Sequence, residues 1–336
     1  MPELLARLVV GLLPVILFLL GLIYFDSYKL VRMRWVLGTI ALGGVVAGLT
    51  YLINVWLITN LNLDIRVYSR YVAPVIEELA KALVLVFLLR AHRIGFLVDA
   101  AIYGFAIGAG FALVENLYYL QSLPDSRFVV WLVRGCGTAI MHGGATAIFG
   151  IMAKALSERD GVPVALAYVP GLMLATIVHS VFNHFFLTPL LSTVGILIAL
   201  PPLVVFVFER SEKSLARWIN VGFDAHTELL ELIESGGLSE SKVGLYLTSL
   251  KERFRGEVVA DLLCYLRLHV ELSLRAKGLL MMRESGFRAE VGEQTRAKFK
   301  ELEFLEGSIG KTGKLAMAPF LQLSNQDLWQ LYMLGK

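Results

Sequence analysis

Residues 95–121 read GFLVDAAIYGFAIGAGFALVENLYYLQ, and this stretch decides the fold. It is long enough to cross the hydrocarbon core of a bilayer, which takes about 20 apolar residues. Its glycines suit close packing against neighbouring membrane helices. It also contains Glu115, and an ionisable group inside a membrane span is costly and points to function. The stretch therefore predicts a transmembrane helix that contributes to a functional site.

Apolar runs on both sides of this stretch extend the pattern. We predict seven transmembrane helices, near residues 4–25, 35–59, 71–90, 95–121, 128–154, 162–188 and 190–210. The predicted fold class is all-α, a polytopic membrane helix bundle. With 57% hydrophobic and 18% charged residues and a mean hydropathy of +0.67, the chain is unlike a soluble protein. A net charge of +3 without a clustered basic face argues against a nucleic-acid partner and for a lipid bilayer.

Charged residues become frequent only after residue 210, which predicts two domains. Residues 1–210 form the transmembrane domain, and residues 211–336 form a helical soluble C-terminal domain. Helical spacing in the second domain lies near 214–234, 239–255, 257–284 and 287–306. The two cysteines, Cys136 and Cys264, fall one in each domain, so neither a disulfide framework nor a cysteine-based zinc site is expected.

The basic residues of the loops predict the orientation of the chain. Loops 25–35, 90–94 and 154–161 and the segment after residue 210 are richer in Lys and Arg than the alternate loops. Basic loops stay in the cytoplasm. We expect a multi-pass protein of the cytoplasmic membrane, with its N-terminus outside and its C-terminal domain in the cytoplasm.

Polar side chains interrupt four consecutive spans. They are Glu77, Glu78 and Lys81 in the third, Glu115 and Asn116 in the fourth, Arg134 and His142 in the fifth, and His179, Asn183 and His184 in the sixth. From the helical rise, Glu115 lies ~9 Å, Glu78 ~10 Å, His179 ~13 Å and His142 ~20 Å below the outer end of its span. These depths predict one layer in the outer half of the bilayer. Adjacent helical residues point about 100° apart, so only one of Glu77 and Glu78 faces a shared site, and we favour Glu78.

Such a group of side chains suits hydrolysis. A carboxylate is a stronger base in an apolar site, where its charged form is poorly solvated. Imidazole binds metal or donates to an oxyanion. Two histidines and a carboxylate are also the ligands of catalytic zinc sites, with water as the fourth ligand. The single-helix motif H-E-x-x-H is absent, so the ligands of any metal would come from different spans.

Four motifs, in chain order, resemble those of the PrsW family of intramembrane proteases, a distant relative of the CAAX-prenyl endopeptidases: Glu77-Glu78-x-x-Lys81, Phe111-x-x-x-Glu115-Asn116, the single His142, and His179-x-x-x-Asn183. The resemblance covers roughly residues 70–190 and not the tail. It implies a peptidase that cleaves membrane-anchored proteins near the extracytoplasmic face. Family members are usually treated as metalloproteases, whereas the distant relatives work through glutamate and histidine, so the need for a metal stays open.

The predicted catalytic residues are then Glu77, Glu78, Glu115, His142, His179 and Asn183. In this interpretation a glutamate of the pair is the base and Asn183, with a histidine, stabilises the oxyanion. If a metal is bound, the predicted ligands are Glu115, His142 and His179 and the metal is Zn²⁺.

Other interpretations of the same residues are structural or belong to another class of protein. The third-span charges can lock helices together, Glu115 can pair with Arg134, and the histidines and Asn183 can bond helices to one another. Asp99, His184 and the three histidines in loops or the tail are interpreted as structural: His92, His226 and His269. Chains of Glu and His also form proton relays, so a proton-coupled transporter or a non-catalytic membrane sensor is the alternative function.

Overall fold

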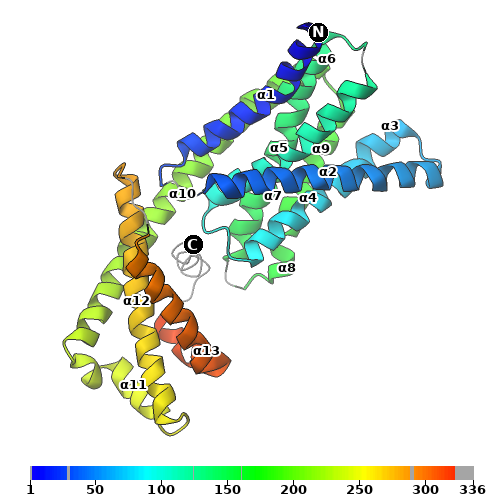
Figure 1. Cartoon of the computed structure of the whole chain (residues 1–336). Coiled ribbons are helices and arrows are strands. Elements are labelled where there is room, and N and C mark those ends of the chain that lie inside the picture. The colour runs from blue at the N-terminus through cyan, green and yellow to red at the C-terminus, as the bar shows by residue number, and fades with distance from the viewer. Residues whose placement is uncertain (1, 29–30, 124, 160, 288–290, 322–336) are drawn as a thin grey trace. The chain divides into compact units, whose positions relative to one another are not determined.

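The computed structural model describes residues 2–28, 31–123, 125–159, 161–287 and 291–321. Every element within these ranges is helical, which confirms the all-α class (Figure 1). Three parts of the predictions lie outside the described residues: Lys29 in the basic loop, residues 288–290 of the last predicted tail helix, and residues 322–336. The chain divides into two compact units, Met1–Ser211 and Glu212–Lys336.

The N-terminal unit contains the following helices: α1 (Pro2–Phe25), α2 (Met33–Leu61), α3 (Ile65–Val67), η1 (Tyr68–Val72), α4 (Ala73–Arg90), α5 (Leu97–Ser122), α6 (Phe128–Leu132), η2 (Val133–Thr138), α7 (Ala139–Ser157), α8 (Val164–Ala167), α9 (Val169–His184) and the first part of α10 (Pro189–Glu234). In the described part of the chain, six helical segments are long and apolar enough to cross a membrane. The predicted third span, α4, is not among them, and its 18 residues include Glu77, Glu78 and Lys81. The unit is a polytopic membrane bundle.

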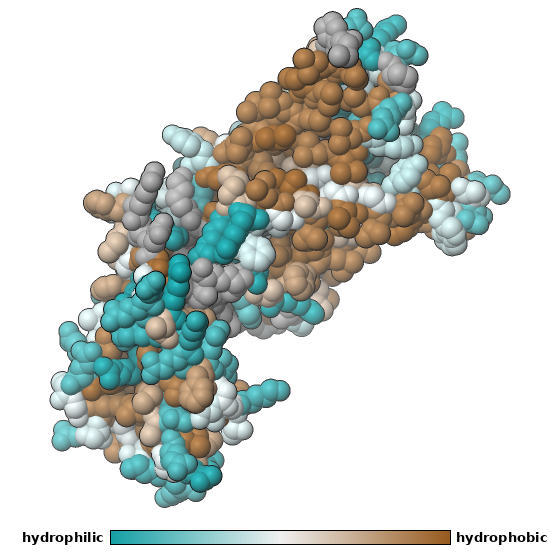
Figure 2. Space-filling view, in the orientation of Figure 1, coloured by the Kyte–Doolittle hydropathy of each residue, from teal (hydrophilic) through white to brown (hydrophobic). Residues whose placement is uncertain are grey.

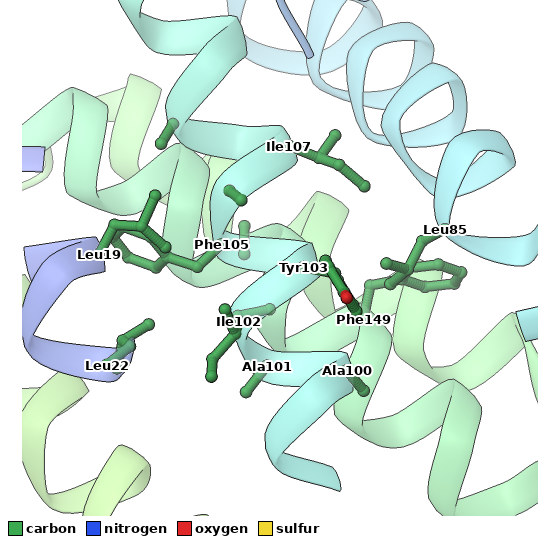
Figure 3. Close-up of a cluster of buried hydrophobic side chains, with 14 of the residues drawn as sticks. Leu19, Leu22, Leu85, Ala100, Ala101, Ile102, Tyr103, Phe105, Ile107 and Phe149 are labelled. Carbon is green, nitrogen blue, oxygen red and sulfur yellow. The ribbon is translucent and has the colours of Figure 1, made fainter. Parts of the chain in front are cut away.

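Helix α5 forms the centre of the N-terminal unit. Its residues from Val98 to Ala112 are all buried, unlike those of the outer helices. Figure 3 shows Ile102 and Phe105 of α5 with Leu19 of α1 on one side and Phe149 of α7 on the other. Because side chains surround α5 on all sides, an almost uniformly apolar sequence is required there.

Glycines bring α5 within backbone contact of two neighbours. A Cβ atom added at Gly110 would lie 2.0 Å from the carbonyl oxygen of Ile40 in α2. One added at Gly108 would lie 2.2 Å from the carbonyl oxygen of His142 in α7. Only glycine permits this approach, which replaces side-chain packing with backbone contact. Residues of α5 and α7 that are polar are thereby held close together.

The outer helices expose their apolar side chains. Figure 2 shows hydrophobic residues over much of the visible face of the N-terminal unit and hydrophilic residues gathered on the C-terminal unit. Large side chains of α2 such as Leu52 and Trp56 are 64% and 61% exposed. A surface of this kind is stable in lipid and not in water.

Two short π-helices, η1 and η2, precede the helices that carry Glu77 and His142. Pro74 has no N–H, so the carbonyl of Arg70 loses its normal helical donor, and Ser180 Oγ of α9 donates to it at 2.6 Å. The N–H of Ala73 donates to Tyr68, five residues back, which frees the Ser69 carbonyl. Both carbonyls have lost their helical donors, and lipid offers none. Donors on α9 therefore hold that helix against η1.

The C-terminal unit consists of the end of α10, η3 (Gly237–Glu240), α11 (Lys242–Leu250), α12 (Gly256–Glu284) and α13 (Glu293–Leu321). Helices α12 and α13 pack together, and Leu262, Leu266 and Leu305 of these helices are buried. Within the described residues this unit is a small helical assembly with its own apolar core.

Candidate active site

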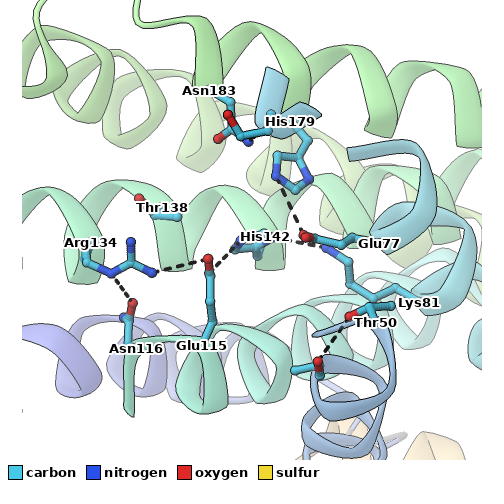
Figure 4. Close-up of polar contacts among 12 residues, drawn as sticks. Thr50, Glu77, Lys81, Glu115, Asn116, Arg134, Thr138, His142, His179 and Asn183 are labelled. Carbon is cyan, nitrogen blue, oxygen red and sulfur yellow. Dashed lines mark hydrogen bonds and ion pairs between the residues drawn. The ribbon is translucent and has the colours of Figure 1, made fainter. Parts of the chain in front are cut away.

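A cavity of about 570 Å³ lies within the N-terminal unit. Residues of α2, η1, α4, α5, η2, α7 and α9 line it. Five of the six predicted catalytic residues stand on its wall: Glu77, Glu115, His142, His179 and Asn183. Aromatic side chains such as Tyr118 and Phe185 supply much of the remaining surface. The polar residues of four separate helices therefore meet at one cavity (Figure 4).

Glu77 and Glu78 of α4 have different surroundings. The side chain of Glu77 is 14% exposed and faces the cavity, whereas that of Glu78 is 1% exposed and does not line it. Neighbouring helical positions point in different directions, as expected from helix geometry. The placement favours Glu77 as the group that reaches a substrate, and the sequence-based preference for Glu78 receives no support from it.

Lys81 fixes the buried side of the site. Its ammonium lies 2.5 Å from Glu78 Oε1 and 3.0 Å from His142 Nδ1, and it also sits over the Phe111 ring, 4.5 Å from the ring centre. A lysine can only donate, so Nδ1 of His142 accepts and Nε2 carries the ring proton. A single buried cation thus orients one carboxylate and one imidazole.

His179 of α9 completes the link to α4. Its Nδ1 donates to Glu78 Oε1 at 2.8 Å, and its Nε2 lies 3.9 Å from Glu77 Oε2. The rings of His142 and His179 meet edge to face, with centres 4.6 Å apart. With Nδ1 bonded to a carboxylate, Nε2 of His179 presents its lone pair toward the cavity.

Glu115 lies between His142 and Arg134. Its Oε2 accepts from His142 Nε2 at 3.1 Å, and its Oε1 is 3.3 Å from Arg134 Nη2. Arg134 also donates through Nε to Asn116 at 2.9 Å (Figure 4). Its guanidinium stacks on Tyr119. Glu115 is therefore both paired with Arg134 and bonded to His142, which holds its carboxylate in place. The carboxylate still lines the cavity.

Asn183 lines the cavity while bonding to the backbone of η1. Its Nδ2 donates to the Ser69 carbonyl at 2.9 Å. An amide nitrogen carries two hydrogens, so a second donor remains for a ligand in the cavity.

His184 and Asp99, which the sequence also singles out, do not line the cavity. His184 follows Asn183 in the chain but faces away from the cavity. Its Nδ1 bonds to the Ser180 carbonyl, and its ring contacts Tyr71. Asp99 caps the start of α5 by accepting from the N–H groups of Gly95 and Phe96.

Sequence reasoning missed two residues of the site, Asn54 of α2 and Tyr68 of η1. Both line the cavity, and Asn54 Nδ2 donates to Glu77 Oε1 at 3.2 Å. The sequence does point to Asn54, because an asparagine within the predicted span 35–59 needs a hydrogen-bond partner that lipid cannot supply. Asn54 carries no charge, so attention to ionisable residues alone misses it.

Within the described part of the chain, one set of side chains lies close enough together to bind a metal ion. Ligand atoms of Glu77, His142 and His179 all lie within 4.8 Å of one another. Two imidazoles and one carboxylate are the donors of catalytic zinc sites. This set contains Glu77 where the sequence predicted Glu115.

Comparison with known proteins identifies the family. Residues 31–208, more than half of the chain, match the family described as PrsW family intramembrane metalloprotease. No curated protein and no solved structure matches the chain. The match includes every helix that lines the cavity. The chain therefore belongs to the PrsW family of intramembrane metalloproteases.

Proposed function

We propose that the chain hydrolyses peptide bonds of membrane-anchored proteins, with the attacking water bound where Glu77, His142 and His179 converge. The observation that carries this proposal is the convergence of the three ligand atoms within 4.8 Å on the wall of a cavity of about 570 Å³. Pockets of this volume accommodate a short peptide segment. The protein then sequesters both the water and the scissile bond from lipid.

Glu77, His142 and His179 fit the metal that the family description implies, and we assign Zn²⁺ to them. When bound, zinc supplies a Lewis acid that polarises the peptide carbonyl and makes water nucleophilic at neutral pH. His179 is already oriented for this role, because Glu78 holds its Nδ1 and leaves Nε2 toward the cavity. His142 would exchange one of its present bonds, to Lys81 or to Glu115, for the metal.

Glu115 and Asn183 have the remaining roles. Glu115 is the carboxylate on the cavity wall outside the set of three, and it takes the proton that water loses and returns it to the leaving amine. Asn183 donates its second amide hydrogen to the oxyanion. Both side chains are fixed by Arg134 and by Ser69 respectively, so little reorganisation is needed.

The basic loops support cleavage near the extracytoplasmic side of the cell membrane. In the proposed topology the N-terminus lies outside. Residues 211–336 form a soluble helical domain in the cytoplasm. The predicted outer-half depth of the polar layer agrees with this direction. The expected substrate is a protein with a membrane anchor whose scissile bond lies at or near the outer surface.

The test is cleavage of a single-span substrate by the purified protein in liposomes. Glu77→Gln and His179→Ala should each lower kcat by at least about 100-fold. Exhaustive chelation should abolish cleavage and added zinc should restore it, while Glu252→Gln, an exposed glutamate of the C-terminal unit, should behave as wild type. Undiminished cleavage by Glu77→Gln and His179→Ala, or proton flux without cleavage, would overturn the proposal.

A further inference from the structure

A short hydrogen-bond chain runs from η1 through α2 to the catalytic carboxylate. The hydroxyl of Tyr68 donates to Asn54 Oδ1 at 2.8 Å, and Asn54 Nδ2 donates to Glu77 Oε1 at 3.2 Å. Tyr68 is 2% exposed, and Asn54 is partly buried on the cavity wall. The proposed reaction does not yet use either side chain.

The chemistry of the three groups fixes the direction of this chain. An ionised carboxylate only accepts hydrogen bonds, so the NH₂ side of the Asn54 amide must face Glu77. The carbonyl side then faces Tyr68, whose hydroxyl is able to donate to it. The amide has one orientation that satisfies both neighbours: the Glu77 carboxylate sets it, and the bond from Tyr68 stabilises it.

The two oxygens of Glu77 are distinguished by this arrangement. Oε1 is held by Asn54, while Oε2 lies 3.9 Å from His179 Nε2. A free glutamate side chain rotates about three bonds, and each productive encounter would require those rotations to be fixed. A bond to one oxygen leaves the other at a defined place among the converging ligand atoms.

We propose that Asn54 is a positioning residue that presents Glu77 Oε2 to the catalytic water and its metal, with Tyr68 orienting the Asn54 amide. The inference rests on the proposed function, because it assigns a task to the second oxygen of Glu77. Contacts at Gly43 and Gly110 hold α2 against α5 without Asn54. Among the described residues, the hydrogen bonds of the Asn54 side chain lead to Tyr68 and Glu77.

The test compares two identical substitutions on α2. Asn54→Leu removes the amide and keeps similar volume, whereas Asn60→Leu does the same at an exposed site whose amide bonds only its own helix, at Trp56. With a single-span substrate in liposomes, Asn54→Leu should lower kcat about 10–100-fold. Its KM should stay within about twofold of wild type, because the bond acts in the reaction and not in substrate binding. Asn60→Leu should match wild type in both constants.

Two more measurements separate positioning from a general loss of structure. Tyr68→Phe should give a smaller loss of kcat, and adding it to Asn54→Leu should cause no further loss, because Tyr68 acts through Asn54. Competition with a zinc chelator should show about 10–100-fold weaker zinc binding by Asn54→Leu and none of this change in Asn60→Leu.

The outcomes distinguish this inference from the function on which it rests. If Glu77→Gln is inactive but Asn54→Leu has wild-type kcat and zinc affinity, the positioning role is wrong and the proposed function stands. If Glu77→Gln cleaves as wild type, the proposed function fails and the positioning role fails with it.

Discussion

Lys81 contacts both a carboxylate, Glu78, and an imidazole, His142, in the buried half of the site. Its side chain has no exposed surface. Burying a cation is costly unless it is paired, and a buried pair becomes strongly destabilising when one member is removed. Lys81 is thus needed both to neutralise Glu78 and to set the proton position of His142.

Replacing Lys81 with Met should therefore destabilise the protein by about 3–5 kcal/mol, because the Glu78 carboxylate would stay buried without its cation. Thermal unfolding in detergent micelles measures the effect. Adding Glu78→Gln removes the buried charge and should recover much of the loss. Lys251→Met, an exposed lysine, is the matched control, and a Lys81→Met protein as stable as that control would contradict the argument.

Gly108 shows how tightly α5 and α7 are coupled. A Cβ atom there would lie 2.2 Å from the His142 carbonyl oxygen and 2.7 Å from Gly143 Cα. Backbone cannot yield as a flexible side chain does, so the two helices would have to separate. His142 would move with α7.

Gly108→Ala should thus lower both stability and cleavage. A displacement of about 1 Å at a reacting group can cost about 100-fold in rate. Gly38→Ala on α2 is the control, because no atom lies within 4 Å of the added Cβ. There the better helix propensity of alanine should leave stability unchanged or raise it by up to about 1 kcal/mol. Equal kcat values for the two variants would contradict the coupling.

His269 in α12 provides a pH-dependent contribution to stability outside the membrane spans. It is fully buried, and neither ring nitrogen makes a hydrogen bond within the described residues. Burial, aided by the nearby His226 and Lys277, lowers the pKa of His269 to about 3. In the unfolded chain the pKa returns to about 6.5. The unfolded state therefore binds a proton first as the pH falls.

The C-terminal unit should accordingly be fully stabilised by neutral His269 above about pH 6.5 and should lose that contribution progressively toward pH 3. Hydrogen exchange of α12 in the full chain, corrected for the intrinsic rate, should show less protection at pH 5 than at pH 7. His269→Phe should reduce this difference. An identical pH dependence in wild type and variant would rule out His269 as its source.

Hydropathy predicted the membrane helices well, because lipid requires a long apolar run and an internally bonded backbone. Three of the four helices that carry the polar residues are among these long apolar segments, whereas the fourth, α4, is helical but is not. Hydropathy could not predict η1 and η2, since an extra residue in a helical turn leaves no trace in hydropathy. The choice between Glu77 and Glu78 also depends on that local winding, which sets the direction of each side chain on α4.

The sequence indicates those candidate site residues whose side chains are ionisable, because such groups are rarely buried in lipid. Glu115, His142 and His179 stand out for this reason. Asn54 does not, because a neutral amide is a weaker signal and its partner Glu77 is distant in sequence. Which carboxylate joins the two histidines likewise depends on how α4 and α5 are rotated, and composition does not encode that rotation.

The proposed orientation of the chain across the membrane can be tested through its two cysteines, Cys136 and Cys264. Cys264 is exposed on α12. In a Cys136→Ser background, a membrane-impermeant maleimide should label Cys264 only after the membrane is permeabilised, because the proposed topology has this side in the cytoplasm. Ser122→Cys, in a background lacking both cysteines, should react in intact cells. Labelling of Cys264 in intact cells would reverse the proposed topology.

Pro74 has a consequence for how the cavity can change size. The two carbonyls that it and η1 leave open, at Ser69 and Arg70, are bonded to Asn183 and Ser180. Sliding α9 by one residue would strand both carbonyls in hydrocarbon, where each costs several kcal/mol. The register of α9 against η1 is thereby locked. Any widening that admits a polypeptide must come from the other walls of the cavity.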